Sequence, residues 1–210
     1  MCGRYRLTAK ERYIRDHFGL EYDLSWAPRW NIAPTQQIPI VRQDNKQPER
    51  TFGLVRWGLI PYWTLLANSG LLGRDDPDND PWTEPLGWWL LGFRPRRQAS
   101  GTDRLLTRRR SPKAYSFGMI DDSVFAFAGL WDRWRDPAGE VLETCTILTT
   151  KPNLLVADVH DRMPVILRRE DYDLWLDPGV TNATLVAEYL KPFHSGLMKK
   201  YPVEHASKPH

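Results

Sequence analysis

Two apolar segments, 124–131 and 141–149, lie on either side of a short run of turn-forming residues, and this arrangement restricts the fold most strongly. Both segments are rich in aromatic and β-branched residues, which favour strands. The residues Asp136-Pro137-Ala138-Gly139 between them have the composition of a hairpin turn. The pattern therefore predicts two neighbouring antiparallel strands in the second half of the chain.

Other short apolar runs predict further strands, and three segments have helical character. In segment 8–18, Ile14 and Phe18 are one helical turn apart, Gly19 follows as a stop, and Thr8 is the expected N-cap. Many short strands with few helices predict an α+β fold, with a partly closed, mainly antiparallel sheet or barrel and peripheral helices. The remaining expected strands are 37–42, 50–57, 115–120 and 163–167, and the remaining expected helices are 169–176 and 184–190.

The composition of the 210-residue chain predicts one globular domain. No apolar run approaches the roughly 20 residues of a membrane span, and the chain does not start like a signal peptide. We therefore expect a cytoplasmic protein with no membrane partner. The net charge of +3 permits nucleic-acid binding without requiring it. The five histidines and two cysteines show no metal-ligand spacing, so we expect neither a metal ion nor another cofactor.

The second residue of the chain, Cys2, can acquire unusual chemistry. Removal of Met1 would leave Cys2 with an α-amine beside its thiol, a pair that condenses with an aldehyde and closes a thiazolidine ring. The amine titrates near pH ~8 and the thiol near ~8.5, so both nucleophilic forms exist at neutral pH. Taken alone, Cys2 is better interpreted as an ordinary residue of a frayed terminus. The other cysteine, Cys145, lies in segment 141–149 and is expected to be a buried strand residue.

Four segments, in this order and spacing, resemble the SRAP family, the SOS-response-associated peptidases that form crosslinks with abasic sites in DNA. The resemblance implies an α+β domain that binds single-stranded DNA and captures the ring-opened abasic sugar through Cys2. We expect a monomer whose partner is single-stranded DNA with abasic sites. The four segments are 1–5 (Met-Cys-Gly-Arg-Tyr), 30–36 (Trp-Asn-Ile-Ala-Pro-Thr-Gln), 56–63 (Arg-Trp-Gly-Leu-Ile-Pro-Tyr-Trp) and 158–167 (Asp-Val-His-Asp-Arg-Met-Pro-Val-Ile-Leu).

The resemblance also implies roles for two polar residues in catalysis. His160 takes the part of the acid–base group, and Asn31 is a polar residue that lines the site. A histidine titrates near pH ~6.5, so it can accept and return a proton at physiological pH. From the residues alone, His160 is better explained as a satisfied core or loop histidine, and Asn31 as a simple turn former; the resemblance favours the site for both.

Four more residues are assigned to DNA binding by the same resemblance. Arg4 and Arg162 correspond to positions for phosphate contact, which suits the planar donor group of arginine. Trp57 and Trp63 correspond to positions that stack or wedge near the DNA strand. Alternatives remain for these residues, since Arg162 suits a salt bridge equally well and Trp57 is more simply explained by core packing.

The segment 64–112 departs from the family, and no strand or helix is predicted there. An Asn-Ala-Arg-x-Glu motif expected after Trp63 is absent. Spacing back from Tyr115 places Thr107 where the family has its second acid–base residue, a glutamate, and threonine has no proton to exchange near neutral pH. The match to the last strand of the family also ends early, at Val203.

These departures leave three functions open. The first is crosslinking to abasic sites. The second is a catalytically impaired relative or a non-catalytic module that binds single-stranded DNA. The third is a thiol peptidase that uses Cys2 and His160.

We hypothesise that compensating shifts of the reading frame produced segment 64–112. One permitted codon choice for residues 73–78, read one base later, gives Ala-Glu-Thr-Ile-Arg-Thr, close to the continuation of the family motif. A codon choice for 104–106 begins Gly-Phe in the same way, as the family has before its glutamate. We expect the gene sequence across codons 63–115 to contain two compensating indels relative to other family genes; a continuous alignment without indels would refute the hypothesis.

Overall fold

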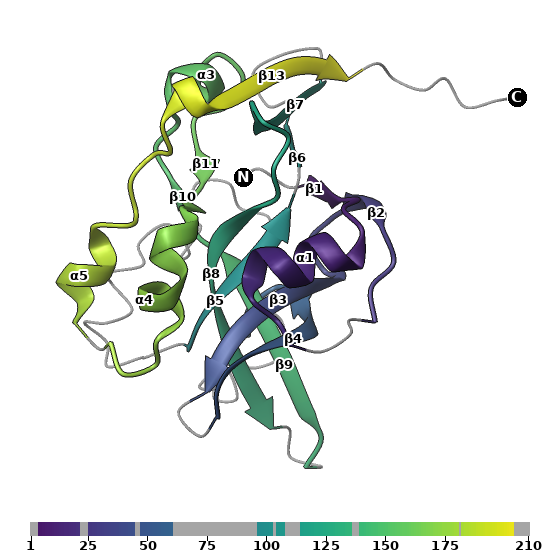
Figure 1. The fold of residues 1–210 in the computed structure, drawn as a ribbon, viewed down its shortest axis with the longest axis vertical. Helices are drawn as coiled ribbons and strands as arrows, with labels where there is room; N and C mark the ends of the chain where they lie inside the picture. The colour runs from purple at the N-terminus through teal and green to yellow at the C-terminus, as the bar shows by residue number, and fades with distance from the viewer. Residues whose placement is uncertain are drawn as a thin grey trace, which may run out of the picture.

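The computed structural model describes residues 4–21, 25–44, 47–60, 96–102, 104–107, 114–135, 139–180 and 182–203. These residues form two main β-sheets with short helices around them (Figure 1). The fold class predicted from the sequence, α+β with a partly closed and mainly antiparallel sheet or barrel, is confirmed. Within these ranges, no helix is long and apolar enough to cross a membrane.

The first sheet has the strand order β13-β7-β6-β1-β2, and all its neighbouring strands are antiparallel. β1 therefore lies inside the sheet, between β6 and β2, whereas β2 forms one edge. The strands are β1 (Arg4–Leu7), β2 (Arg29–Ile32), β6 (Arg104–Thr107), β7 (Ala114–Met119) and β13 (Met198–Val203).

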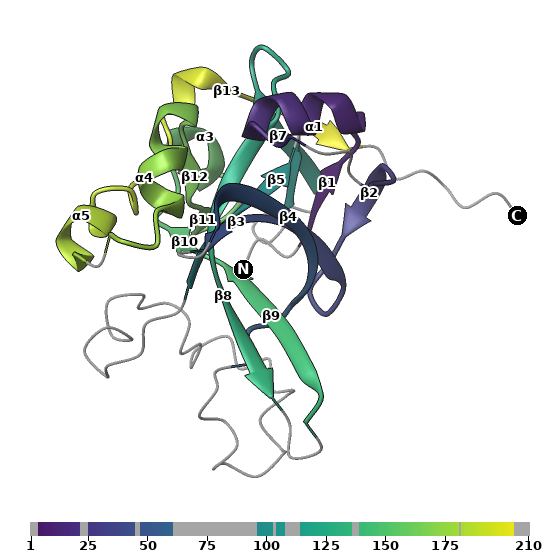
Figure 2. The same cartoon turned by 60° about the horizontal axis from the view of Figure 1, so that its bottom comes forward.

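The second sheet curves into a partly closed barrel (Figure 2). Its order is β12-β8-β5-β3-β4-β9, and β8 also pairs with β9, so the strands from β8 to β9 form a ring. Two short ladders complete this ring, Val41↔Ala99 between β3 and β5, and a parallel pairing of β4 with β9. The strands are β3 (Gln37–Asp44), β4 (Gln47–Trp57), β5 (Arg96–Thr102), β8 (Phe125–Arg135), β9 (Val141–Ile147) and β12 (Ile166–Leu167). A separate pair consists of β10 (Thr149–Thr150) and β11 (Met163–Pro164).

The predicted pair of strands in the second half of the chain is confirmed. β8 and β9 are antiparallel neighbours, with Gly129 opposite Ile147 and Arg135 opposite Val141. The strands predicted at 37–42, 50–57 and 115–120 correspond to β3, β4 and β7. The strand predicted at 163–167 is instead divided between β11 and β12, because the chain changes its pairing partner at Val165.

The first helix is confirmed, but its predicted start is wrong. α1 runs over Glu11–Phe18, buries Ile14 and Phe18, and is followed by Gly19 in the left-handed conformation with φ 65°. Lys10, not Thr8, occupies the N-cap position, and it makes no side-chain cap hydrogen bond. The other helical segments are α3 (Leu154–Ala157), η3 (Arg169–Asp171), α4 (Tyr172–Leu176), α5 (Ala183–Ala187) and η4 (Ser195–Leu197).

Strands β5 and β6 lie within segment 64–112, where no strand was predicted. β5 pairs with β8 along its whole length, from Arg96↔Trp131 to Thr102↔Phe125. β6 pairs with β1 on one side and β7 on the other. Both sheets therefore depend on this segment, of which residues 96–102 and 104–107 are described.

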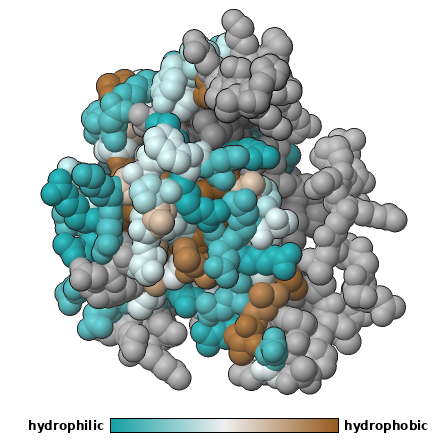
Figure 3. All heavy atoms as spheres, turned by 90° about the vertical axis from the view of Figure 1, so that its right-hand side faces the viewer, coloured by the Kyte–Doolittle hydropathy of each residue, from teal (hydrophilic) through white to brown (hydrophobic). Residues whose placement is uncertain are grey.

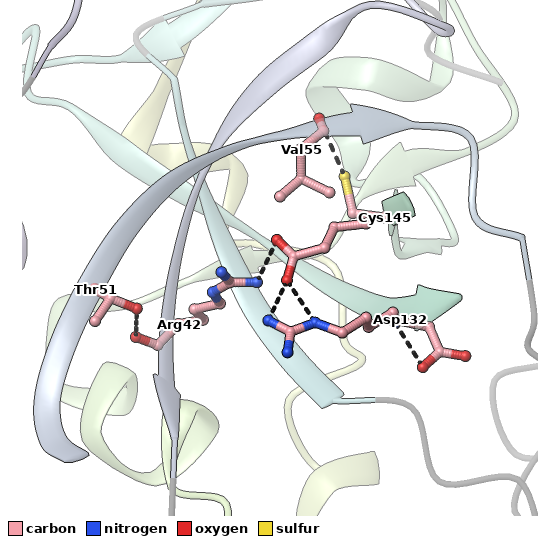
Figure 4. Close-up of polar contacts among 7 residues, drawn as sticks. Arg42, Thr51, Val55, Asp132 and Cys145 are labelled. Atoms are coloured by element: carbon pink, nitrogen blue, oxygen red, sulfur yellow. Dashed lines mark hydrogen bonds and ion pairs between the residues drawn. The ribbon is translucent and has the colours of Figure 1, made fainter. Parts of the chain in front are cut away.

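Aromatic side chains join the two sheets. The buried ring of Tyr5, in β1, has its centroid 5.8 Å from that of Trp57 in β4 and 5.7 Å from that of Phe127 in β8. Because Tyr5 belongs to the first sheet and its partners to the second, these contacts hold β1 against the barrel. Cys145 is buried in β9, as predicted, with its Sγ 3.9 Å from the carbonyl oxygen of Val55 (Figure 4).

An arginine–glutamate cluster links three strands of the barrel (Figure 4). Glu143 of β9 accepts hydrogen bonds from Arg42 of β3 at 3.0 Å and from Arg133 of β8 at 2.7 Å. The Cζ atom of Arg42 also lies 4.1 Å from the ring centroid of Trp131. Burial raises the pKa of the Glu143 carboxyl, but the hydrogen bonds and charges of the two arginines outweigh this effect and hold the pKa below its ordinary value. The carboxylate therefore stays charged and joins β3, β8 and β9.

His17 on α1 is held in its neutral form. Its Nε2 shares a 2.8 Å hydrogen bond with the hydroxyl of Tyr172 on α4. Burial, followed by the positive charge of Arg169, lowers the pKa of His17 from 6.5 to about 4. Between these two values the unfolded chain binds a proton that the folded chain does not. The contribution of His17 to stability is therefore complete above pH 6.5 and is lost as the pH falls toward about 4.

The substitution His17→Gln tests this pH dependence. Glutamine keeps a hydrogen bond to Tyr172 but does not titrate. Between about pH 7 and about pH 5, we expect the free energy of unfolding to fall by about 1 kcal/mol more in the unchanged protein than in the variant, allowing for solvent screening of the partly exposed ring. Urea unfolding at both pH values measures the difference, and equal losses would show that His17 is not the responsible group.

Candidate functional site

Arginine and apolar residues alternate along β1 and give the strand two different faces. Tyr5 and Leu7 are buried, whereas Arg4 is exposed and Arg6 is half-buried. Successive residues of a strand point to opposite sides, so the burial of Tyr5 against the barrel turns both arginines outward. β1 therefore presents positive charge on its outer face, directly after the N-terminal residues.

Asn31 meets Arg4 on this face. Nη1 of Arg4 donates a 2.9 Å hydrogen bond to Oδ1 of Asn31 in β2, and both residues are exposed. A guanidinium has five N–H donors, so this bond leaves donors that can contact a phosphate. Two residues that the sequence assigned to one site are thus in direct contact.

A turn after β2 is fastened to the end of β4. Thr35 has φ 73°, in the left-handed region that β-branched residues rarely adopt. Its N–H donates to the carbonyl oxygen of Trp57 at 2.7 Å. The N–H of Trp57 in turn donates to the carbonyl oxygen of Gln36 at 2.8 Å. The guanidinium of Arg29 donates to the side chain of Gln36 from within β2. These bonds hold the turn and thereby fix the end of β2 that carries Asn31.

Trp57 itself lies in the hydrophobic core. Only 6% of its surface is exposed, and its ring packs against Tyr5. The structure therefore places Trp57 beneath β1, as a support for the strand. Its stacking on DNA stays a prediction.

His160 is positioned by the short helix α3. Oδ1 of Asn153 caps this helix by accepting hydrogen bonds from the N–H groups of Leu155 and Val156. The N–H of His160 donates to the carbonyl oxygen of Val156 at 2.9 Å. The backbone of His160 is thus fixed by the capped helix, and its side chain is fully buried, with 0% of the residue exposed.

Two groups contact Nδ1 of His160. The N–H of Arg162 donates a 3.1 Å hydrogen bond to this nitrogen, and Oδ1 of Asp161 lies 2.8 Å from it. The amide requires the lone pair of Nδ1, whereas the carboxylate favours a proton on it, so the two contacts suit different tautomers of the ring. The buried Nδ1 thus lies between an N–H donor and a carboxylate oxygen that can accept a proton.

The remaining predicted residues are placed as follows. Arg162 is half-buried and meets His160 through its backbone. Thr107 is the last residue of β6 and follows Leu106, which is opposite Arg4 in the sheet. Cys2 and Trp63 lie outside the described residues. Among the residues that are described, no group of three or more His, Cys, Asp and Glu side chains is placed to hold a metal ion.

Arg6 and Trp30 are absent from the site predicted from the sequence, although they lie on the same two strands. Cζ of Arg6 is 5.3 Å from the ring centroid of Trp30, and Trp30 is 67% exposed. The alternation of arginine and apolar residues over 4–7 is a signal for a half-buried strand and identifies Arg6 as outward-facing. No comparable signal exists for Trp30, because its exposure depends on an irregular pairing of β2.

Solved structures share this fold. A protein from Bacteroides thetaiotaomicron superposes with a TM-score of 0.75 and 23% sequence identity, covering 97% of this chain and 93% of that one. A protein from Bordetella bronchiseptica superposes with a TM-score of 0.74 and 24% identity, covering 97% of this chain and 100% of the other. At these identities the similarity concerns the fold alone.

Sequence relatives are similar over most of the chain. The abasic site processing protein YoqW of Bacillus subtilis is 32% identical, with 97% of this chain and 92% of YoqW covered. The abasic site processing protein HMCES of Pongo abelii is 25% identical over 80% of this chain and 58% of its own length.

A sequence model of the family described as SOS response associated peptidase (SRAP) matches residues 1–72 and 106–208. The interruption at 73–105 falls inside segment 64–112, which was expected to depart from the family. The match covers both the segment that contains Arg4 and Asn31 and the segment that contains His160. The chain therefore belongs to the SRAP family.

Proposed function

We propose that this protein processes abasic sites in single-stranded DNA by forming a covalent thiazolidine crosslink through Cys2 after Met1 is removed. The observation that carries the proposal is the Arg4–Asn31 pair on the outer face of β1, which begins two residues after Cys2. The names of the relatives YoqW and HMCES, both abasic site processing proteins, support it.

The proposed crosslink needs no external oxidant or reductant. The ring-opened abasic sugar carries an aldehyde, to which the α-amine of Cys2 adds. Loss of one water molecule gives an imine. The thiol sulfur then adds to the imine carbon while the thiol proton passes to the nitrogen, which closes the thiazolidine ring. Water is the only product released.

Three described residues, Arg4, Asn31 and His160, are assigned roles in this proposal. The exposed guanidinium of Arg4 contacts a phosphate beside the lesion, while its bond to Asn31 fixes the orientation of the guanidinium. His160 exchanges protons as the sugar ring opens and as water leaves. The two contacts of its Nδ1, one with an N–H donor and one with a carboxylate, support this role.

A second function, binding of single-stranded DNA without efficient crosslinking, is favoured by the residue at position 107. The match to the family resumes at residue 106, so Thr107 lies inside a matched segment. In the sheet, it directly follows the partner of Arg4. A threonine hydroxyl cannot replace the proton exchange of a glutamate near neutral pH. A relative of this kind would keep Arg4 and Asn31 for binding but react slowly.

Denaturing gel electrophoresis separates the two functions. Purified protein is incubated with single-stranded DNA that contains one abasic site, and with the same DNA undamaged. We expect a shifted band with the damaged DNA only, because the thiazolidine needs an aldehyde. The substitution Cys2→Ala is expected to abolish the band, whereas Cys145→Ala, which changes the buried cysteine of β9, is expected to leave it unchanged.

Two results would contradict the crosslinking function. A band that survives Cys2→Ala would exclude the thiazolidine mechanism. The absence of a band with the unchanged protein, if circular dichroism shows a folded chain and the undamaged strand still binds, would leave the non-catalytic function instead.

The substitution His160→Ala tests the acid–base role. We expect the crosslink to form more slowly, on the order of 10²-fold, because proton transfer by a positioned side chain typically contributes 10²–10⁴-fold. The rate is measured by stopping the reaction at intervals and separating the products on the same gel. Imidazole added to the buffer should restore part of the rate, which a purely structural role would not produce.

His17→Gln is the matched control for this experiment, since it changes a histidine of α1. An unchanged rate in His160→Ala, or an equal loss of rate in His17→Gln, would return His160 to a structural role.

A further inference from the structure

The pairing of β1 with β2 contains an irregularity that changes what the edge strand exposes. Tyr5 is opposite Ile32 and Leu7 is opposite Arg29, so Arg6 faces two residues of β2 instead of one. These two residues are Trp30 and Asn31, and both are exposed. In a regular strand, neighbouring residues point to opposite sides. The extra residue therefore forms a β-bulge. The bulge interrupts the alternation, so a side chain that would otherwise point inward points outward.

The bulge produces two contacts between the same strands. Asn31 accepts a hydrogen bond from Arg4, and the ring of Trp30 lies beside the guanidinium of Arg6, with 5.3 Å between Cζ and the ring centroid. Trp30 nevertheless remains 67% exposed. An indole this exposed gains little from burial in the folded chain, so core packing does not account for its position.

The chemistry of the β1–β2 face, made of Arg4, Arg6, Trp30 and Asn31, suits one class of ligand. Unpaired bases stack on exposed aromatic rings, and arginine side chains beside them contact the phosphates. On the side of the molecule on which β2 lies, the described residues are mostly hydrophilic, and their hydrophobic atoms form several small, separate groups (Figure 3). A broad apolar protein interface would require a larger continuous patch. Positive charge next to a single exposed ring is better matched to a nucleic acid strand.

We propose that Trp30 and Arg6 form a base-stacking subsite that holds an undamaged nucleotide of single-stranded DNA beside the lesion. Trp30 supplies the ring on which the base stacks, and Arg6 contacts the phosphate of that nucleotide. The subsite deepens the proposed function and rests on it for the identity of the ligand. It adds a binding position that does not depend on Cys2.

Equilibrium binding of a short, fluorescein-labelled, undamaged DNA strand to the full chain tests the subsite. Fluorescence anisotropy gives the Kd for the unchanged protein, Trp30→Ala and Trp30→Phe. We expect Trp30→Ala to raise the Kd at least about five-fold, the effect of losing one stacked base, and Trp30→Phe to retain most of the affinity. With duplex DNA of the same sequence, Trp30→Ala should have little effect because its bases are already paired and stacked.

The chain offers a matched control on α1. Tyr13 is 52% exposed, and Cζ of Arg12 lies 4.7 Å from its ring centroid, so it is a second exposed aromatic–arginine pair. Tyr13→Ala is expected to leave the Kd unchanged. Equal losses in Trp30→Ala and Tyr13→Ala, or equal losses for single-stranded and duplex DNA, would overturn the subsite.

The role of Arg6 is measured by the salt dependence of binding. Loss of one phosphate contact in Arg6→Gln should reduce the slope of log Kd against log salt concentration by about 0.7, the value for one phosphate of a single strand. An unchanged slope would remove Arg6 from the phosphate contacts.

Crosslinking of the same variants to abasic DNA distinguishes the subsite from the proposed function. If the subsite exists, Trp30→Ala needs more DNA for half-maximal crosslinking but reaches the same maximal rate. If the protein forms no crosslink but Trp30→Ala still weakens binding of the undamaged strand, the subsite is supported and the proposed function is refuted. If the protein forms the crosslink but Trp30→Ala leaves the Kd unchanged, the proposed function is supported and the subsite is refuted.

Discussion

Tyr5 packs between the two sheets, with its ring against Trp57 of β4 and Phe127 of β8, and the orientation of the N-terminal strand depends on this contact. Because side chains alternate along a strand, burying Tyr5 forces Arg4 and Arg6 to the outer face. The first sheet then holds the strand between β6 and β2. The two arginines of β1 are thereby presented on a fixed surface.

The proposed site combines rigid and irregular elements. Asn31 and Trp30 lie on an edge strand, where a bulge exposes both of them, and the turn that follows is held by hydrogen bonds to the end of β4. His160 is fixed by a capped helix on a different segment of the chain. Regular strands thus provide the support and Arg4, while Asn31 comes from the bulge and His160 follows a helix end. Such positions free side chains from the strict alternation of a sheet.

Much of the fold was predictable because its signals are local. The apolar runs of β3, β4, β7, β8 and β9 identify strands, and Gly19 correctly marks the end of α1. Local rules failed in two places. Thr8 has capping-box spacing, yet the helix starts at Glu11. β5 and β6 have no apolar pattern of their own, and they are strands because each lies between two partner strands whose backbone groups they pair with.

The sequence by itself determined the family and the α+β class, since motifs and short apolar runs are properties of neighbouring residues. Only the tertiary structure decided that Arg4 meets Asn31 across two strands and that Trp30 stands exposed beside Arg6. The physical reason is that strand register, bulges and burial arise from pairing between segments far apart in the chain. A bulge in particular adds one residue to one strand, and no local pattern in this sequence marks where that occurs.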